Sequence, residues 1–170
     1  MNDFLNDWCL PIATFLPLAG ALIMMVVPRA DEELHKVIAL VSSLLVVGVG
    51  VWILFNFDFD RTQDLQFTVD KGWIDVIHAR FQMGLDGISL PLLLLTMLVT
   101  PLVIIYSWNH FPEPHNPKAF LALMLVLETG MNGTFAAQDL ILFFVFFEVV
   151  LLPMFFMIAV WGARTGAMPR

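Results

Sequence analysis

Five long apolar stretches dominate this sequence and set what it can fold into. Each is about 20 residues long, which is the length that an α-helix needs to cross the hydrocarbon core of a bilayer. Backbone groups in lipid must be satisfied internally, and runs of consecutive leucines lack the alternation of a barrel strand. We therefore predict an all-α, polytopic membrane protein with five transmembrane helices, at about residues 10–27, 37–57, 88–108, 119–137 and 140–161.

Composition supports this prediction and excludes several classes of protein. Hydrophobic residues make up 59% of the 170 residues and charged residues only 14%, whereas soluble domains contain about 25% charged residues. Eight basic residues against fifteen acidic ones give a net charge of -7, so nucleic acid is not an expected partner. The single cysteine excludes an internal disulfide, and no cysteine–histidine cluster suggests zinc. The lipid bilayer is the first expected partner.

The basic residues predict the orientation of the chain. With five spans, the loops at 28–36 and 109–118 share one side of the membrane with the segment after residue 161. Because positive loops stay inside, we expect a cytoplasmic Arg170 end and an outside N-terminus. The five basic residues on the cytoplasmic side are Arg29, Lys36, Lys118, Arg164 and Arg170. All three lysines, including Lys71 in the opposite loop, fall outside the predicted spans.

The long connection at 58–87 has a period of two residues on both sides of Lys71-Gly72. Such alternation predicts a β-hairpin at about residues 65–85, lying over the outer ends of the helices. The hairpin either docks a neighbouring subunit or serves as a lid on the bundle, and both interpretations stay open. The alternating apolar residues are Leu65, Phe67, Val69, Phe81, Met83 and Leu85.

The smaller polar features point to structure and not to a metal site. Asp86 or Ser89, at the start of the third span, is expected to cap its first turn. His110 and His115 flank a proline-rich loop without a third ligand nearby, and we expect both to be solvated. His35 and His78 are equally isolated in the sequence.

Two glutamates are the only charged residues inside the predicted spans. Glu128 lies ten residues before Gln138, and Glu148 lies nine residues after Asp139. The short break at Gln138-Asp139 must sit near the outer interface, which places both carboxyl groups about 14–15 Å deep. That depth is about half of the hydrocarbon thickness. Two antiparallel helices therefore carry a carboxyl group each at matched depth.

This arrangement indicates ion or proton handling. An ionised carboxylate at that depth costs at least about 2.5–3.5 kcal/mol, so each group is poised to take up or release a proton. Asn132 lies one turn after Glu128, where it can hydrogen-bond the carboxyl group. Pro153 leaves the carbonyl of Val149 without its helical donor, which creates a local polar defect. The alternative is that both glutamates are protonated and only tie helices together.

The same region resembles a known family. The resemblance rests on Gly130-Met131-Asn132-Gly133, on the run from Gln138 to Glu148, on Leu152-Pro153-Met154 and on Trp161-Gly162. These segments resemble the antiporter-like subunits of respiratory complex I. The spacing FFE-x(4)-PM-x(6)-WG is most similar to the chain M branch of the bacterial proton-translocating NADH:quinone oxidoreductase.

The resemblance implies a helical bundle built from two inverted five-helix repeats, with a β-hairpin after the second helix. Glu148 falls on the family's essential glutamate of the fifth helix, and Glu128 falls on its fourth-helix glutamate. In the family, a lysine on a later, broken helix pairs with the position of Glu148. No lysine lies within the predicted spans here, so we expect residues 1–170 to form one membrane domain, the N-terminal part of a longer subunit.

The resemblance also implies a function. The chain would be a membrane subunit of complex I in the bacterial inner membrane, contributing Glu148 and Glu128, with Asn132 and Pro153 in support, to proton translocation coupled to quinone reduction. It would carry no cofactor, since NADH, FMN, iron–sulfur clusters and quinone would belong to partner subunits. Its partners would be other membrane subunits, including sibling antiporter-like subunits. The alternatives are a subunit of a multi-subunit Na⁺/H⁺ antiporter and a structural membrane scaffold.

Overall fold

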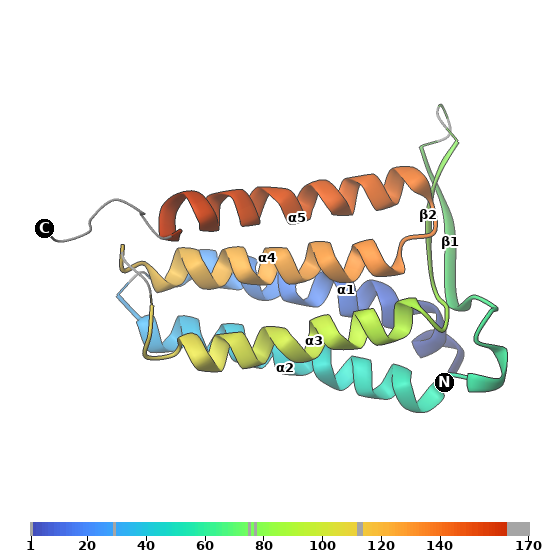
Figure 1. The fold of residues 1–170 in the computed structure, drawn as a ribbon, viewed down its shortest axis with the longest axis horizontal. Helices are drawn as coiled ribbons and strands as arrows, with labels where there is room; N and C mark the ends of the chain where they lie inside the picture. Colours follow the sequence, from blue (N-terminus) through green and yellow to red (C-terminus); the bar gives the residue numbers. More distant parts are fainter. Residues whose placement is uncertain (1, 29, 75, 77, 112–113, 163–170) are drawn as a thin grey trace, which may run out of the picture.

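A computed structural model describes all residues except 1, 29, 75, 77, 112–113 and 163–170. Within these residues, five helices run side by side and a two-stranded sheet crosses one end of the bundle (Figure 1). All five are long and apolar enough to cross a membrane, which confirms the predicted spans. The helices are α1 (Asn2–Val26), α2 (Glu32–Asn56), α3 (Ser89–Ser107), α4 (Pro117–Ala136) and α5 (Leu140–Trp161).

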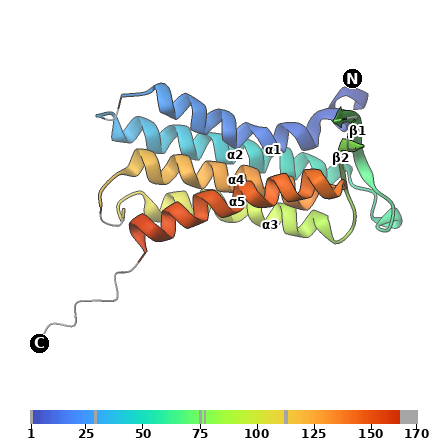
Figure 2. The same cartoon turned by 90° about the horizontal axis from the view of Figure 1, so that it is seen from above.

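The two ends of the bundle differ. The hairpin end carries the sheet, and the tail end is where α1, α3 and α5 finish (Figure 1). Helix α4 lies in the middle and packs against all four other helices (Figure 2), whereas α5 packs mainly on α4 and on strand β2. One side of α5 is therefore left uncovered within the described residues.

The sheet confirms the predicted hairpin. After a short 3₁₀ turn, η1 (Phe59–Arg61), strand β1 (Gln66–Ile74) pairs antiparallel with strand β2 (Ala79–Leu85). Met83 and Leu85 of β2 are completely buried over the helix ends. The turn between α4 and α5 is bonded to the same strand, because the backbone N–H of Gln138 donates to the carbonyl of Gln82 at 2.9 Å. The side-chain amide of Gln138 donates to the carbonyl of Gly84 at 3.1 Å.

Helix α2 begins five residues earlier than predicted, which corrects the placement of Lys36. The helix starts at Glu32, and two glutamates in its first turn suit the positive end of the helix dipole. Lys36 therefore lies inside the helix and is largely buried. Its ammonium group bonds the carboxylate of Glu33 at 2.7 Å and lies 5.7 Å from the ring centres of Trp108 and Phe111. Acidic and basic residues at a helix end lower the hydropathy, so the sequence pattern underestimated this helix.

Helix α4 also begins earlier than predicted and takes in Lys118. Asn116 caps the helix and Pro117 occupies its first position, where a missing N–H does no harm. The ammonium group of Lys118 donates to the carbonyls of Met25 and Val27 at 3.0 and 2.6 Å. This lysine thus satisfies carbonyl groups at the end of α1.

Two aspartates cap helices at the hairpin end. The carboxylate of Asp86 accepts the backbone N–H of Ser89 at 2.7 Å, which confirms the predicted cap of α3. That bond is the main reason why the pKa of Asp86 is lowered. Asp139 caps α5 in the same way, and the backbone N–H of Leu142 is the main cause of the lowered pKa of Asp139.

Candidate functional site

Glu128 lies in the interior of the bundle. It sits on α4, eight residues before the last residue, Ala136, and its exposed fraction is 0%. Neither carboxyl oxygen has a hydrogen-bond partner among the described residues. A buried polar group without a hydrogen-bond partner lowers the free energy of unfolding by about 1–3 kcal/mol. The Glu128 carboxyl group therefore does not serve to stabilise the isolated bundle.

Asn132 does not hydrogen-bond Glu128, which corrects the prediction made from their spacing. Its amide group donates instead to the carbonyl of Ala13 on α1 at 3.2 Å. Pro17 explains this choice, because Ala13 would normally accept the backbone N–H of residue 17 and proline has none. The Oδ1 atom of Asn132 is left without a partner among the described residues.

Glu148 lies at the matching level on α5 but faces away from α4. It follows the first residue of α5, Leu140, by eight residues, as expected for matched depth. Its side chain is exposed on the uncovered side of the helix. Phe146 explains this orientation, because it is buried against Gly133 of α4 and a residue two positions later lies about 200° further around the helix. The two carboxyl groups therefore do not share one pocket within this chain.

Pro153 lies on the covered side of α5, where it is buried. The turn before it meets α4 closely, since a methyl group added at Gly130 would lie 2.9 Å from the backbone nitrogen of Val150. The predicted polar defect at the carbonyl of Val149 thus sits in the contact between the two glutamate-bearing helices. Small residues at such positions allow two helix backbones to approach each other.

His35 is a buried group that sequence reasoning missed. It lies in the first turns of α2 with an exposed fraction of 0%, and neither ring nitrogen has a partner among the described residues. The spacing of His35, Ala39 and Ser43 by four residues could have revealed it, because this spacing marks one buried helix face. The other histidines, His78 and His110 among them, are exposed as loop residues.

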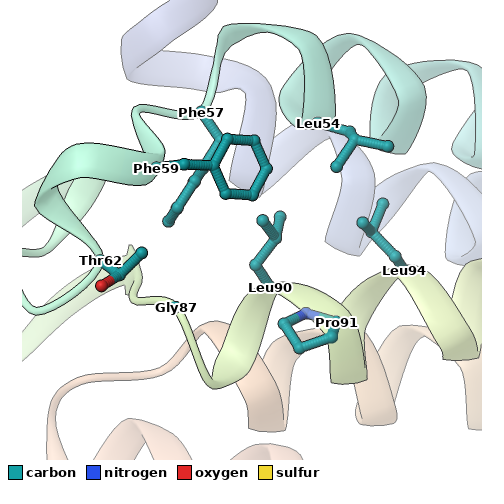
Figure 3. Close-up of a pocket in the computed structure, with 8 residues that line it drawn as sticks. All are labelled: Leu54, Phe57, Phe59, Thr62, Gly87, Leu90, Pro91 and Leu94. Atoms are coloured by element: carbon teal, nitrogen blue, oxygen red, sulfur yellow. The ribbon is translucent and has the colours of Figure 1, made fainter.

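An apolar pocket of about 210 Å³ lies at the hairpin end, away from both glutamates. Figure 3 shows Phe57 and Phe59 on one side of it and Leu90 and Pro91 on the other. None of its lining residues is titratable, so it offers no proton chemistry. Over the described part of the chain, no three histidine, cysteine, aspartate or glutamate side chains gather to hold a metal ion.

Solved structures match this fold closely. Respiratory complex I from Thermus thermophilus with bound NADH contains a chain that matches 88% of this one with a TM-score of 0.70 at 22% identity, over 28% of its own length. The Mrp complex from a Dietzia species contains a chain that matches 94% with a TM-score of 0.72 at 18% identity, over 17% of its length. At such identities these likenesses concern the fold alone.

Sequence comparison is more specific. NADH-quinone oxidoreductase subunit M of Rhodobacter capsulatus is 38% identical over 159 residues, which are 91% of this chain. The chain spans 30% of the length of that relative. Residues 12–134 match the family described as NADH-ubiquinone oxidoreductase chain 4, amino terminus. The resemblance noted in the sequence is thereby confirmed, and the chain belongs to the NADH-ubiquinone oxidoreductase chain 4 family.

Proposed function

We propose that this chain forms the N-terminal membrane domain, residues 1–170, of a longer proton-translocating subunit of an NADH:quinone oxidoreductase. In this role Glu148 and Glu128 take up and release protons, and Asn132 and Pro153 support them. The chain contributes to a translocase and carries no redox chemistry itself. The proposal extends what is known of the relatives, since the chain spans only 30% of the subunit from Rhodobacter capsulatus.

The observation that carries this proposal is the burial of Glu128 halfway along a membrane-spanning helix without any partner for its carboxyl oxygens. Polar groups inside a membrane usually serve a pathway or bind a partner. A purely structural glutamate would be expected to hydrogen-bond a neighbouring helix. Both polar neighbours on α4 bond elsewhere, since the hydroxyl of Thr129 donates to the carbonyl of Leu125 and the amide of Asn132 donates to the carbonyl of Ala13.

Glu148 supports the same function from the other side of α5. An exposed carboxylate halfway along an apolar helix is costly against lipid, so we expect protein to cover it. The covering helices would come from the rest of the longer subunit or from neighbouring membrane subunits, including sibling antiporter-like ones. A cation on those helices would pair with Glu148 and shift with it during proton transfer.

The proposed setting is the bacterial inner membrane, with the N-terminus outside and the Arg170 end in the cytoplasm. Arg164 and Arg170, on which this orientation partly depends, lie outside the described residues. NADH, FMN, iron–sulfur clusters and quinone would bind to partner subunits. Redox energy would then reach this subunit through conformational or electrostatic coupling.

A multi-subunit Na⁺/H⁺ antiporter is the second candidate, because the Mrp chain has the same fold. The family match and the 38% identity to an oxidoreductase subunit favour the first candidate. Purification of the native assembly separates the two. Flavin and iron–sulfur absorbance that co-purifies with the subunit supports the oxidoreductase, and its absence with Na⁺-dependent proton exchange supports the antiporter.

The central test is Glu148→Gln in the full-length subunit within its assembled complex. We expect the rate of NADH-driven proton pumping into inverted membrane vesicles to fall about tenfold or more. A general acid or base typically contributes about 10²–10⁴-fold to the rate of a proton-transfer reaction. Electron transfer from NADH to an artificial acceptor should stay unchanged, which shows that the redox subunits are intact, and co-purification of the variant subunit with them shows that the complex has assembled.

Glu32→Gln is the matched control, because Glu32 is a half-exposed glutamate in the first turn of α2, away from both glutamates of the proposed site. It should pump at the rate of the unmodified complex. Near-normal pumping by Glu148→Gln would remove the proposed role. If neither Glu148 nor Glu128 changed its protonation during turnover, as measured by infrared difference spectroscopy, the scaffold interpretation would replace it.

A further inference from the structure

Five buried side-chain atoms in the described part of the chain lack a hydrogen-bond partner. They belong to only three residues and comprise both ring nitrogens of His35, both carboxyl oxygens of Glu128 and the Oδ1 atom of Asn132. All three residues have exposed fractions of 0%. Buried polar groups in native proteins are almost always satisfied, and ordered water is the usual partner when protein groups are missing.

These three residues lie on two helices that pack against each other, and we call the buried interior between these helices the column. Helices α2 and α4 both run from the tail end to the hairpin end and pack against each other (Figure 1). His35 is the fourth residue of α2, and Glu128 is the twelfth of α4. The rise of an α-helix therefore separates them by about 12 Å along the bundle. Asn132 lies one turn beyond Glu128 on the same face of α4.

Contacts of α1 with both helices show which residues of α2 and α4 lie at similar levels along the bundle. A methyl group added at Gly20 of α1 would touch both Ser42 of α2 and Leu125 of α4. Ser42 is the eleventh residue of its helix and Leu125 is the ninth. The two counts differ by two residues, about 3 Å, so His35 lies about 12–15 Å from Glu128 along the bundle, on its tail-end side.

The charged groups at the tail end are engaged elsewhere. Lys36 bonds Glu33 at 2.7 Å, and the imidazole of His115 lies 3.3 Å from the carboxylate of Glu32. Lys118 bonds carbonyl groups of the α1 end. Among the described residues, the remaining acid of this end is Asp31. Its backbone carbonyl accepts the backbone N–H of His35, and the imidazole of His35 takes no part in this bond. Water is therefore the partner that fits the two ring nitrogens.

Between His35 and Glu128, the facing helices carry small residues on one side and large ones on the other, and Ala39, Leu121 and Leu125 pack in one apolar cluster. On α2, Ala39 and the buried hydroxyl of Ser43 follow His35 along the same face. On α4, Leu121 and Leu125 precede Glu128 and are completely buried. These two leucines close the column in this structure, as an apolar constriction closes a pore by excluding water.

We infer that His35 holds water at the tail end of the bundle, and that this water reaches Glu128 when Leu121 and Leu125 move aside. His35 is then a positioning residue for a proton path to Glu128 that runs inside α1–α4, separate from Glu148 on the outer side of α5. The proton passes between a carboxyl oxygen of Glu128 and water, and no other bond changes. This inference rests on the proposed function and adds the route by which one of its two carboxyl groups meets solvent.

The test uses the full-length subunit in its assembled complex. Transfer to D₂O shifts the infrared carbonyl band of a protonated carboxyl group, and the band of Glu128 is identified by its loss in Glu128→Gln. The rate of this shift measures access of water to Glu128. We expect His35→Leu to slow the shift about tenfold or more, because an apolar side chain leaves the column dry.

Three further variants make the result specific. His35→Gln keeps donors and acceptors for water and should exchange at nearly the rate of the unmodified complex. Met24→Leu alters another completely buried side chain near the tail end of α1 and should also leave the rate unchanged. Leu125→Ala widens the constriction and should speed the exchange.

The inference is overturned if His35→Leu exchanges at the unmodified rate, if His35→Gln is as slow as His35→Leu, or if Met24→Leu slows exchange equally. A missing Glu128 carbonyl band overturns it as well, since Glu128 would then be ionised. Pumping by Glu148→Gln is measured in parallel. Normal pumping there removes the proposed function, whereas lost pumping with exchange that is insensitive to His35 removes only this inference.

Discussion

Helices α4 and α5 are neighbours in sequence and in space, yet they place their glutamates in opposite surroundings. Glu128 on α4 is enclosed by helices of this chain, and Glu148 on α5 points to an uncovered surface at the same level. The cause is the position of each helix, because α4 is central and α5 is peripheral.

The comparison teaches that depth in the membrane and environment are separate properties. Depth follows from counting residues along a helix, and it is matched for the two glutamates. Environment follows from which helix faces lie together. The surroundings of Glu128 are fixed by this chain, whereas those of Glu148 depend on surfaces that lie beyond α1–α4.

The largest difference between the two positions is expected when a lysine replaces each glutamate. Glu128→Lys buries an unpaired ammonium group and should destabilise the chain by about 3 kcal/mol. Glu148→Lys should cost much less, since the long lysine side chain can extend from the uncovered side of α5 toward water. Unfolding in detergent followed by circular dichroism compares the two, and equal losses would mean that Glu128 is not enclosed.

The contact between the two helices can be tested at Gly133. A side chain added there would overlap the ring of Phe146, so Gly133→Val should lower the free energy of unfolding by about 1–3 kcal/mol. Gly48→Ala is the control, because nothing lies within 4 Å of an added methyl group there. If both variants unfolded alike, Phe146 would not hold α5 on α4, and the orientation of Glu148 would lose its explanation.

The interior side of α4 can be examined through Asn132. Asn132→Leu removes the hydrogen bond to the carbonyl of Ala13, with an expected loss of about 0.6–1.7 kcal/mol. In a Pro17→Ala background the same change should cost less, because residue 17 then supplies a backbone N–H to that carbonyl. A double-mutant cycle of unfolding free energies measures this, and equal costs in both backgrounds would rule out the link to Pro17.

The smallest expected effect concerns the cap between the two helices. The pKa of Asp139 is lowered by its bonds to the first amides of α5, so the cap stabilises at pH values above the unfolded pKa, about 3.9. This stabilisation is lost as the pH falls through the lower pKa of the folded state. The protection factors of the Ile141 and Leu142 amides, which compare their exchange with the intrinsic rate at each pH, should therefore fall on acidification, and Asp139→Asn should flatten this dependence. Asp64→Asn, in the exposed loop before β1, should leave the dependence intact.

Much of the fold could be predicted because its determinants are local. Twenty apolar residues in a row define a span whatever surrounds them, and the alternation around Lys71 defines a hairpin. The levels of Glu128 and Glu148 also followed, since both are counted from the same turn at Gln138.

What could not be predicted depends on contacts between distant segments. Lys36 was predicted to lie in a loop. In the structure it lies within α2, beside Trp108 and Phe111, which follow α3 in the chain. The partner of Asn132 lies 119 residues earlier in the chain. The outward orientation of Glu148 was hidden as well, because α5 is apolar on all sides and gives no periodic pattern to read.

The bonds between Gln138 and strand β2 have a mechanical consequence. These bonds hold the start of α5 in place. A tilt of α5 relative to α4 is therefore a rotation about the hairpin end of the helix. Glu148 lies about 12 Å from the first residue of α5, and Trp161 at its far end lies about 31 Å from it. A given tilt therefore moves the Trp161 end more than twice as far as the carboxyl group, so a large displacement at the end of the helix becomes a small displacement at its middle.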